Sequence, residues 1–103
     1  MHDLLRRIRA DPNGYLALLE LRLAANRHPG IREELTRTIR DTLEDNVRLH
    51  TEGGLPGDRS TAVALYLAMT GLLVEALTLP GVLGDDGADA LVDRLVDTIV
   101  PRG

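Results

Sequence analysis

The chain has 103 residues and a formal net charge of −4 at pH 7, contains no cysteine, and has two tyrosines as its only aromatic residues. This length predicts one small domain, and the lack of cysteine excludes disulfides, a thiolate nucleophile and a cysteine-ligated metal. An acidic chain with so few aromatic side chains is not expected to bind nucleic acid by itself, because nucleic-acid-binding modules are usually basic.

The N-terminal segment predicts a short basic helix over residues 3–9. It carries charges where a signal peptide needs a long apolar run, so we expect a soluble, cytoplasmic protein. We interpret residues 1–11 as the remnant of a linker helix and residues 12–100 as the core. Residues 1–103 are then a single helical domain.

A second helix is predicted over about residues 12–27, because an Asp-Pro pair supplies a cap and a proline at the first helical position. Most of its surface is apolar, yet Arg22 and Asn26 fall in the same sector as Tyr15 and Leu19. No acid lies three or four residues from Arg22 in the sequence, so its charge has no partner on this helix.

The third predicted helix, about residues 31–52, is the most amphipathic stretch of the chain. A series of polar residues begins at the edge of its apolar face and lies further within that face toward the end of the helix: Thr38, Thr42, Asn46 and His50. Buried polar groups are costly unless they are hydrogen-bonded, so this series, like Arg22, needs partners.

The rest of the chain is organised around a central helix predicted over residues 59–79, which Asp58 can cap and Pro80 ends. From residue 60 to residue 74 it is uncharged and apolar all round, so it must be buried all round. A chain of this length struggles to cover both sides, so we expect a second copy of the chain to supply the missing cover. The alternative is a transmembrane span, but fifteen uncharged residues fall short of the roughly 20 that a bilayer needs.

The last predicted helix, about residues 88–100, has apolar residues in a seven-residue repeat. No segment has the pattern of a strand, so we predict an all-α bundle of about five helices that forms a homodimer. The predicted interface combines small residues of the central helix with apolar residues of the last two helices: Ala64, Ala68, Gly71, Leu72, Val92, Leu95, Val96 and Ile99.

The sequence contains no complete catalytic or metal-binding pattern. The only serine, Ser60, begins a helix and lacks the glycines of a nucleophile elbow. His50 and Glu52 match half of a deaminase zinc signature, but its cysteine pair is missing. Three aspartates crowd one helix N-terminus without the spacing of a calcium loop: Asp85, Asp86 and Asp89. We therefore expect no enzyme activity, no metal and no cofactor.

The polar residues of the second and third helices leave two interpretations open. In one, they bond each other or reach water, and His28 and His50 meet the exposed carbonyls at helix C-termini. In the other, they line a largely aliphatic cavity whose occupant satisfies them. The predicted ligand-binding set then has aliphatic walls and polar candidates: Leu19, Leu23, Ile39, Leu43 and Met69, with Arg22, Asn26, Thr42, Asn46, His50 and Tyr66. An inward Arg22 implies an anionic acceptor on the ligand, and an outward Arg22 implies a neutral, apolar ligand.

Two stretches of the sequence match a known pattern. Residues 15–32 read YLALLELRLAANRHPGIR, and residues 70–73 read TGLL, followed by Leu77. The first stretch resembles the leucine-rich helix and the Ala-Ala-x-Arg-x-Pro-x-(Leu/Ile)-Arg passage of TetR-family transcriptional regulators. The second resembles their long penultimate helix, and the match runs in order from about residue 12 to residue 100.

This resemblance implies the effector-binding and dimerisation domain of a TetR-like repressor, whose last two long helices form a four-helix bundle with the partner's copies. The family's DNA-binding helix-turn-helix half is absent from this sequence, so we expect a fragment whose missing N-terminal domain binds operator DNA. The expected partners are a second copy and a small apolar or weakly anionic effector, with no nucleic acid for this chain alone and no membrane. The alternative is a free-standing helical ligand carrier or protein-interaction module with no DNA role.

Overall fold

The computed structural model describes residues 2–84 and 87–101. These residues form five α-helices and one turn of 3-10 helix, and they contain no strand. The elements in chain order are α1 (His2–Ala10), α2 (Asn13–Ala25), α3 (Pro29–Glu52), α4 (Arg59–Thr78), η1 (Pro80–Val82) and α5 (Gly87–Ile99). The all-α prediction is confirmed, and every predicted helix is present with its ends within two residues of those expected.

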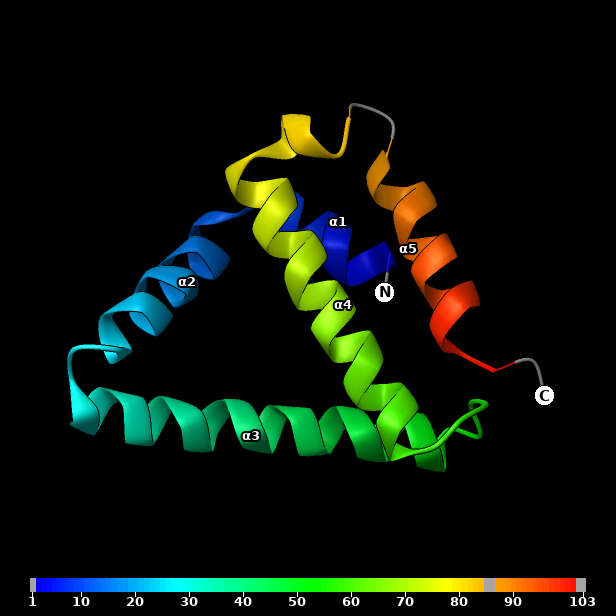
Figure 1. Ribbon diagram of the computed structural model, residues 1–103, viewed down its shortest axis with the longest axis horizontal. Coiled ribbons are helices and arrows are strands. Elements are labelled where there is room, and N and C mark those ends of the chain that lie inside the picture. Colours follow the sequence, from blue (N-terminus) through cyan, green and yellow to red (C-terminus); the bar gives the residue numbers. More distant parts are fainter. Residues whose placement is uncertain (1, 85–86, 102–103) are drawn as a thin grey trace.

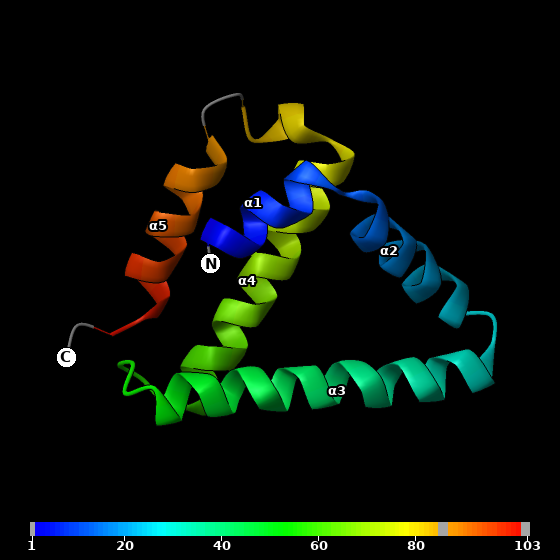
Figure 2. The same cartoon turned by 180° about the vertical axis from the view of Figure 1, so that it is seen from behind.

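Three of the helices outline a triangle, with the long α3 as one side and α2 and α4 as the other two (Figure 1). α3 packs against α2 toward one end and against α4 toward the other, and α5 packs beside α4. α1 crosses the face of α4 that is turned to the viewer in Figure 2. The turn η1 lies at the end of α4 that is remote from α3 (Figure 1).

The connection between α3 and α4 is fixed by side chains on both sides. The carboxylate of Asp58 accepts a hydrogen bond from the backbone N–H of Thr61 at 3.3 Å, which confirms the predicted cap of α4. Gly57 precedes it with φ +101°, a left-handed conformation that favours glycine. Arg59 donates to both carboxylate oxygens of Glu44 on α3, with 2.8 Å between Nη1 and Oε2. This hydrogen bond lowers the pKa of Glu44.

A small core joins α1, α4 and α5. Leu5 on α1 and Val92 on α5 are each 1% exposed, and they pack with three residues of α4: Met69, Leu72 and Leu73. The core therefore starts earlier than residue 12, where the sequence analysis placed its beginning. The reason is that Leu5 and Ile8 lie three positions apart, so even this short basic helix presents one apolar side to the core.

Two residues predicted for the dimer interface lie inside this core instead. Leu72 and Val92 are 6% and 1% exposed in the single chain, so neither offers surface to a partner. Because α4 is apolar on all sides, its sequence does not indicate which side packs against α1 and α5. Of the other predicted interface residues, Gly71 is exposed and five are partly buried: Ala64, Ala68, Leu95, Val96 and Ile99.

α4 is poorly covered by its own chain. Only 22% of the residues in its most apolar stretch are buried, and Leu67 is 62% exposed. By length and composition alone α4 could also cross a membrane, but the core helix of a soluble protein passes the same test. The uncovered side of α4 is an apolar surface that a partner can bury.

Candidate ligand-binding cleft

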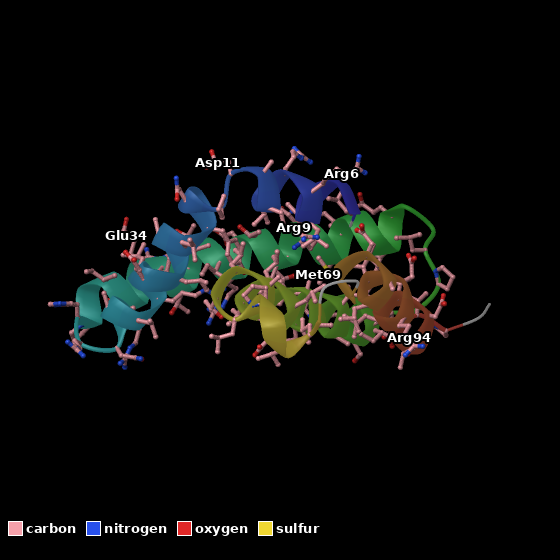
Figure 3. The ribbon with its side chains drawn as sticks, turned by 90° about the horizontal axis from the view of Figure 1, so that it is seen from above. Arg6, Arg9, Asp11, Glu34, Met69 and Arg94 are labelled. Atoms are coloured by element: carbon pink, nitrogen blue, oxygen red, sulfur yellow. The ribbon has the colours of Figure 1, made fainter. Side chains whose placement is uncertain are left out.

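A cleft of about 980 Å³ lies among the helices, and residues of all five contribute to its walls. Most of these walls are aliphatic, with Leu4 and Ile8 from α1, Leu18 from α2, Leu35, Ile39 and Leu49 from α3, Leu65, Met69 and Leu73 from α4, and Val92, Val96 and Val100 from the end of the chain. Figure 3 places Met69 toward the middle of the molecule, while the charged Arg6, Glu34 and Arg94 lie at its periphery. A mostly apolar cleft with a few polar groups is the usual form of a small-molecule site.

Seven of the eleven predicted ligand-binding residues line this cleft: Arg22, Ile39, Thr42, Asn46, His50, Tyr66 and Met69. The structure therefore brings together side chains from α2, α3 and α4 that lie far apart in the sequence. Whether they bind a ligand stays a prediction.

The other four predicted residues are not among the residues that line the cleft: Leu19, Leu23, Asn26 and Leu43. The sector of α2 that faces the cleft carries Leu18 and Arg22, so Leu19 and Leu23, one position further on, turn away. Leu23 is 70% exposed and borders a separate hollow of about 290 Å³. Asn26 is exposed beyond the end of α2, where its carbonyl accepts a hydrogen bond from Arg32 Nη2 at 2.9 Å.

Arg22 spans the cleft from α2 to α4. Its Nη2 donates a hydrogen bond to the hydroxyl of Tyr66 at 3.1 Å, and its Nε is buried without a hydrogen-bond partner among the described residues. Of the two orientations considered from the sequence, the side chain thus adopts the inward one. A guanidinium with a buried, unsatisfied N–H can still accept an anionic or carbonyl group as a partner.

Two polar residues that the sequence analysis did not select for the cleft stand beside this arginine. Tyr15 on α2 and Thr70 on α4 both line the cleft. Burial is the larger effect and raises the pKa of Tyr15 above its ordinary value, while the charge of Arg22 opposes this rise. Helical spacing could have found both, since Tyr15 lies seven residues before Arg22 and Thr70 four residues after Tyr66.

The Tyr15 phenol gives a prediction for Arg22. Replacing Arg22 by methionine removes the positive charge that favours the phenolate, so we expect the pKa of Tyr15 to rise further. Titration of a chain with ¹³C-labelled tyrosine follows Tyr15 separately from Tyr66, the only other tyrosine, and keeps the hydrogen bond between Arg22 and Tyr66. Arg37→Met, an exposed substitution on α3 away from the cleft, is the matched control and should leave the titration unchanged. A Tyr15 pKa that falls or stays constant in Arg22→Met would contradict the placement of Arg22.

The polar series of α3 is largely satisfied by the chain itself. The hydroxyl groups of Thr38 and Thr42 donate to the carbonyls of Glu34 and Thr38, at 3.1 and 3.2 Å. His50 is 5% exposed, and its Nε2 lies 2.9 Å from the carbonyl oxygen of Pro56 in the following turn. Thr38, Thr42 and His50 therefore line the cleft with hydrogen-bond partners from the chain's own backbone rather than from one another.

The described residues contain no group of three or more histidine, aspartate or glutamate side chains that could hold a metal ion. Asp85 and Asp86, considered above as part of an acidic cluster, lie outside the described residues. Ser60 is exposed at the start of α4 and does not line the cleft.

The protein is an all-helical domain with a largely apolar cleft among its five helices. The family model described as "Tetracyclin repressor-like, C-terminal domain" matches residues 1–102, and the chain belongs to this family. The resemblance to TetR-family regulators is thereby confirmed. A search of curated proteins finds no match. Domains of this family are regulatory and generally dimerise and bind small effectors, and the regulators that contain them are soluble cytoplasmic proteins.

Proposed function

We propose that this domain is the effector-binding and dimerisation part of a TetR-like transcriptional repressor, and that the cleft among its five helices holds the effector. The observation that carries the proposal is the cleft itself, which measures about 980 Å³ and is walled mainly by aliphatic side chains. Within these walls Arg22 and Tyr66 form a hydrogen-bonded polar pair, and a polar group in a mostly apolar cleft is typical of a small-molecule site. The domain has no role as an enzyme and needs no cofactor in this proposal.

The position of α1 suggests how an effector could control DNA binding. Leu4 and Ile8 on α1 line the cleft, so a bound molecule would contact this helix directly. In a TetR-like regulator the DNA-binding domain precedes the effector domain, and α1 is the segment through which the two would be linked. An effector that binds better to one position of α1 shifts the population toward it and changes the separation of the two DNA-binding domains in a dimer.

We further infer that α4 and α5 form the homodimer interface. The support is the exposed apolar side of α4, on which Leu67 is 62% exposed and Gly71 is also open to solvent. The partly buried residues that the sequence predicts for this interface belong to the same two helices: Ala64, Ala68, Leu95, Val96 and Ile99. In this proposal the partner subunit buries the exposed apolar side of α4, so that the protein is a cytoplasmic dimer and α4 does not contact a membrane.

Two tryptophan substitutions on α3 test the cleft. Thr42→Trp places a large ring in the cleft from an exposed position, whereas Thr36→Trp places the same ring on the same helix outside the cleft. In a thermal-shift screen of small molecules, binding to the native state raises the midpoint of unfolding. We expect compounds that stabilise the unmodified chain and Thr36→Trp but not Thr42→Trp. A screen in which no compound separates the two variants would contradict the proposal.

A further inference from the structure

We infer that the ligand of this cleft is a monocarboxylate with a saturated aliphatic body, and that Arg22 binds its carboxylate. This inference rests on the proposed effector-binding function and specifies the chemical class of the effector. It depends on which polar groups around the cleft are already satisfied and which are not.

Most of the polar side chains of the cleft are satisfied within the chain. Thr38 and Thr42 donate to helix carbonyls, and so does Thr70, whose hydroxyl donates to the carbonyl of Tyr66 at 2.8 Å. His50 is bonded to the carbonyl of Pro56. Groups that already have partners neither require nor strongly select a polar ligand.

Arg22 differs from all of these. Among the described residues it is the only arginine that lines the cleft, its Nε is buried without a hydrogen-bond partner there, and no described carboxylate lies within ion-pair distance of it. Its one bond in the described part of the chain goes to the neutral hydroxyl of Tyr66, whose own O–H stays available as a donor. A partly desolvated cation with a neutral partner favours an anion, because a charge-assisted hydrogen bond is roughly twice as strong as a neutral one.

A cationic ligand fits the same cleft poorly. The one acidic side chain among the described residues that line it, Asp93, is exposed on α5 and already interacts with another group of the chain. The charge that a ligand would meet within the aliphatic part of the cleft is therefore the positive charge of Arg22.

The body of the ligand follows from the walls. Their apolar side chains are leucine, isoleucine, valine, methionine and alanine. The two aromatic rings that line the cleft, Tyr15 and Tyr66, belong to the polar group around Arg22, and the chain has no phenylalanine or tryptophan. A ligand with several polar groups along its body would leave some of them unpaired, which costs free energy. A flexible saturated chain adapts to such walls and is bound by burial of its apolar surface.

Dodecanoate and dodecan-1-ol are matched probes, since they share one aliphatic chain and differ in the charge of the head group. Isothermal titration calorimetry below the critical micelle concentration gives both dissociation constants. We expect the unmodified chain to bind dodecanoate at least about tenfold more tightly than dodecan-1-ol. Arg22→Met should weaken dodecanoate binding by about tenfold to a hundredfold and change dodecan-1-ol binding by less than about threefold. Arg37→Met should affect neither probe, and Arg22→Lys should retain part of the preference.

A spectroscopic measurement locates the head group. Because Arg22 lowers the pKa of Tyr15, a carboxylate paired with Arg22 offsets this charge, and dodecanoate should raise the pKa of Tyr15 more than dodecan-1-ol does. The difference between the two probes should vanish in Arg22→Met. An aliphatic ligand bound elsewhere would leave no such difference.

The outcomes separate this inference from the proposed function. Equal affinity for both probes, unaffected by Arg22→Met, would overturn the carboxylate while leaving an apolar effector site in place. Binding of neither probe would overturn the inference, and the tryptophan variants on α3 would then decide the proposed function independently.

Discussion

Leu5→Ala is expected to lower the free energy of unfolding by about 2–5 kcal/mol, the usual cost of truncating a fully buried leucine. Leu5 is 1% exposed and packs among Met69 and Val92, so the substitution leaves a cavity between α1, α4 and α5. Chemical denaturation followed by circular dichroism measures the change. It should be done at one protein concentration, because unfolding of a dimer is coupled to its dissociation.

The neighbouring leucine on the same helix provides the control. Leu4 is 47% exposed, so Leu4→Ala should cost clearly less than Leu5→Ala. Equal losses for the two variants, or none for either, would show that α1 is not part of the core. Residues 1–11 would then be only a linker, as the sequence analysis expected.

Leu67→Arg should dissociate the homodimer. Leu67 is 62% exposed in the single chain, so arginine leaves the fold of the subunit intact but places two unpaired charges in the proposed α4–α5 interface. Burying a charge without a partner costs about 3–5 kcal/mol, which would raise the dissociation constant of the dimer by more than a hundredfold. Light scattering coupled to size-exclusion chromatography at micromolar concentration reports the mass of the species.

Leu21→Arg tests the specificity of this effect. Leu21 is also exposed, at 41%, but it lies on α2 and outside the proposed interface, so the variant should stay dimeric. A monomeric unmodified chain, or an unchanged dimer in Leu67→Arg, would remove α4 from the interface. Ile99→Arg, on α5, should behave like Leu67→Arg if both helices contribute.

The sequence predicted the helices well because their ends carry local signals. Asp58 caps α4 through its own side chain, as predicted. The third helix was predicted from about residue 31, whereas α3 begins at Pro29, because proline fits the first helical position as well as it ends the helix before it. η1 was not predicted, because Pro80 was interpreted only as the end of α4 and not as the first residue of a further turn.

The side of each helix that faces the core was predicted less well. α3 has a strong apolar stripe, and Ile39, Thr42 and Asn46 all reach the cleft. On α4 the apolar residues surround the helix, so the burial of Leu72 in the chain's own core could not be distinguished from burial against a partner. Only the crossing of α1 and α5 over α4 decides between them, and helix crossing is a property of the assembled fold.

Met69 offers the most direct test of the central claim that the cleft binds a small molecule. It is one of two methionines in the chain, is 7% exposed and lines the cleft, so the spectrum of chain labelled with ¹³C-methyl methionine contains one signal from the proposed site. A compound that stabilises the unmodified chain in the thermal-shift screen should shift the Met69 methyl resonance in the unmodified chain and in Thr36→Trp, and should leave it in place in Thr42→Trp. A Met69 resonance that no stabilising compound moves in the unmodified chain would contradict the claim.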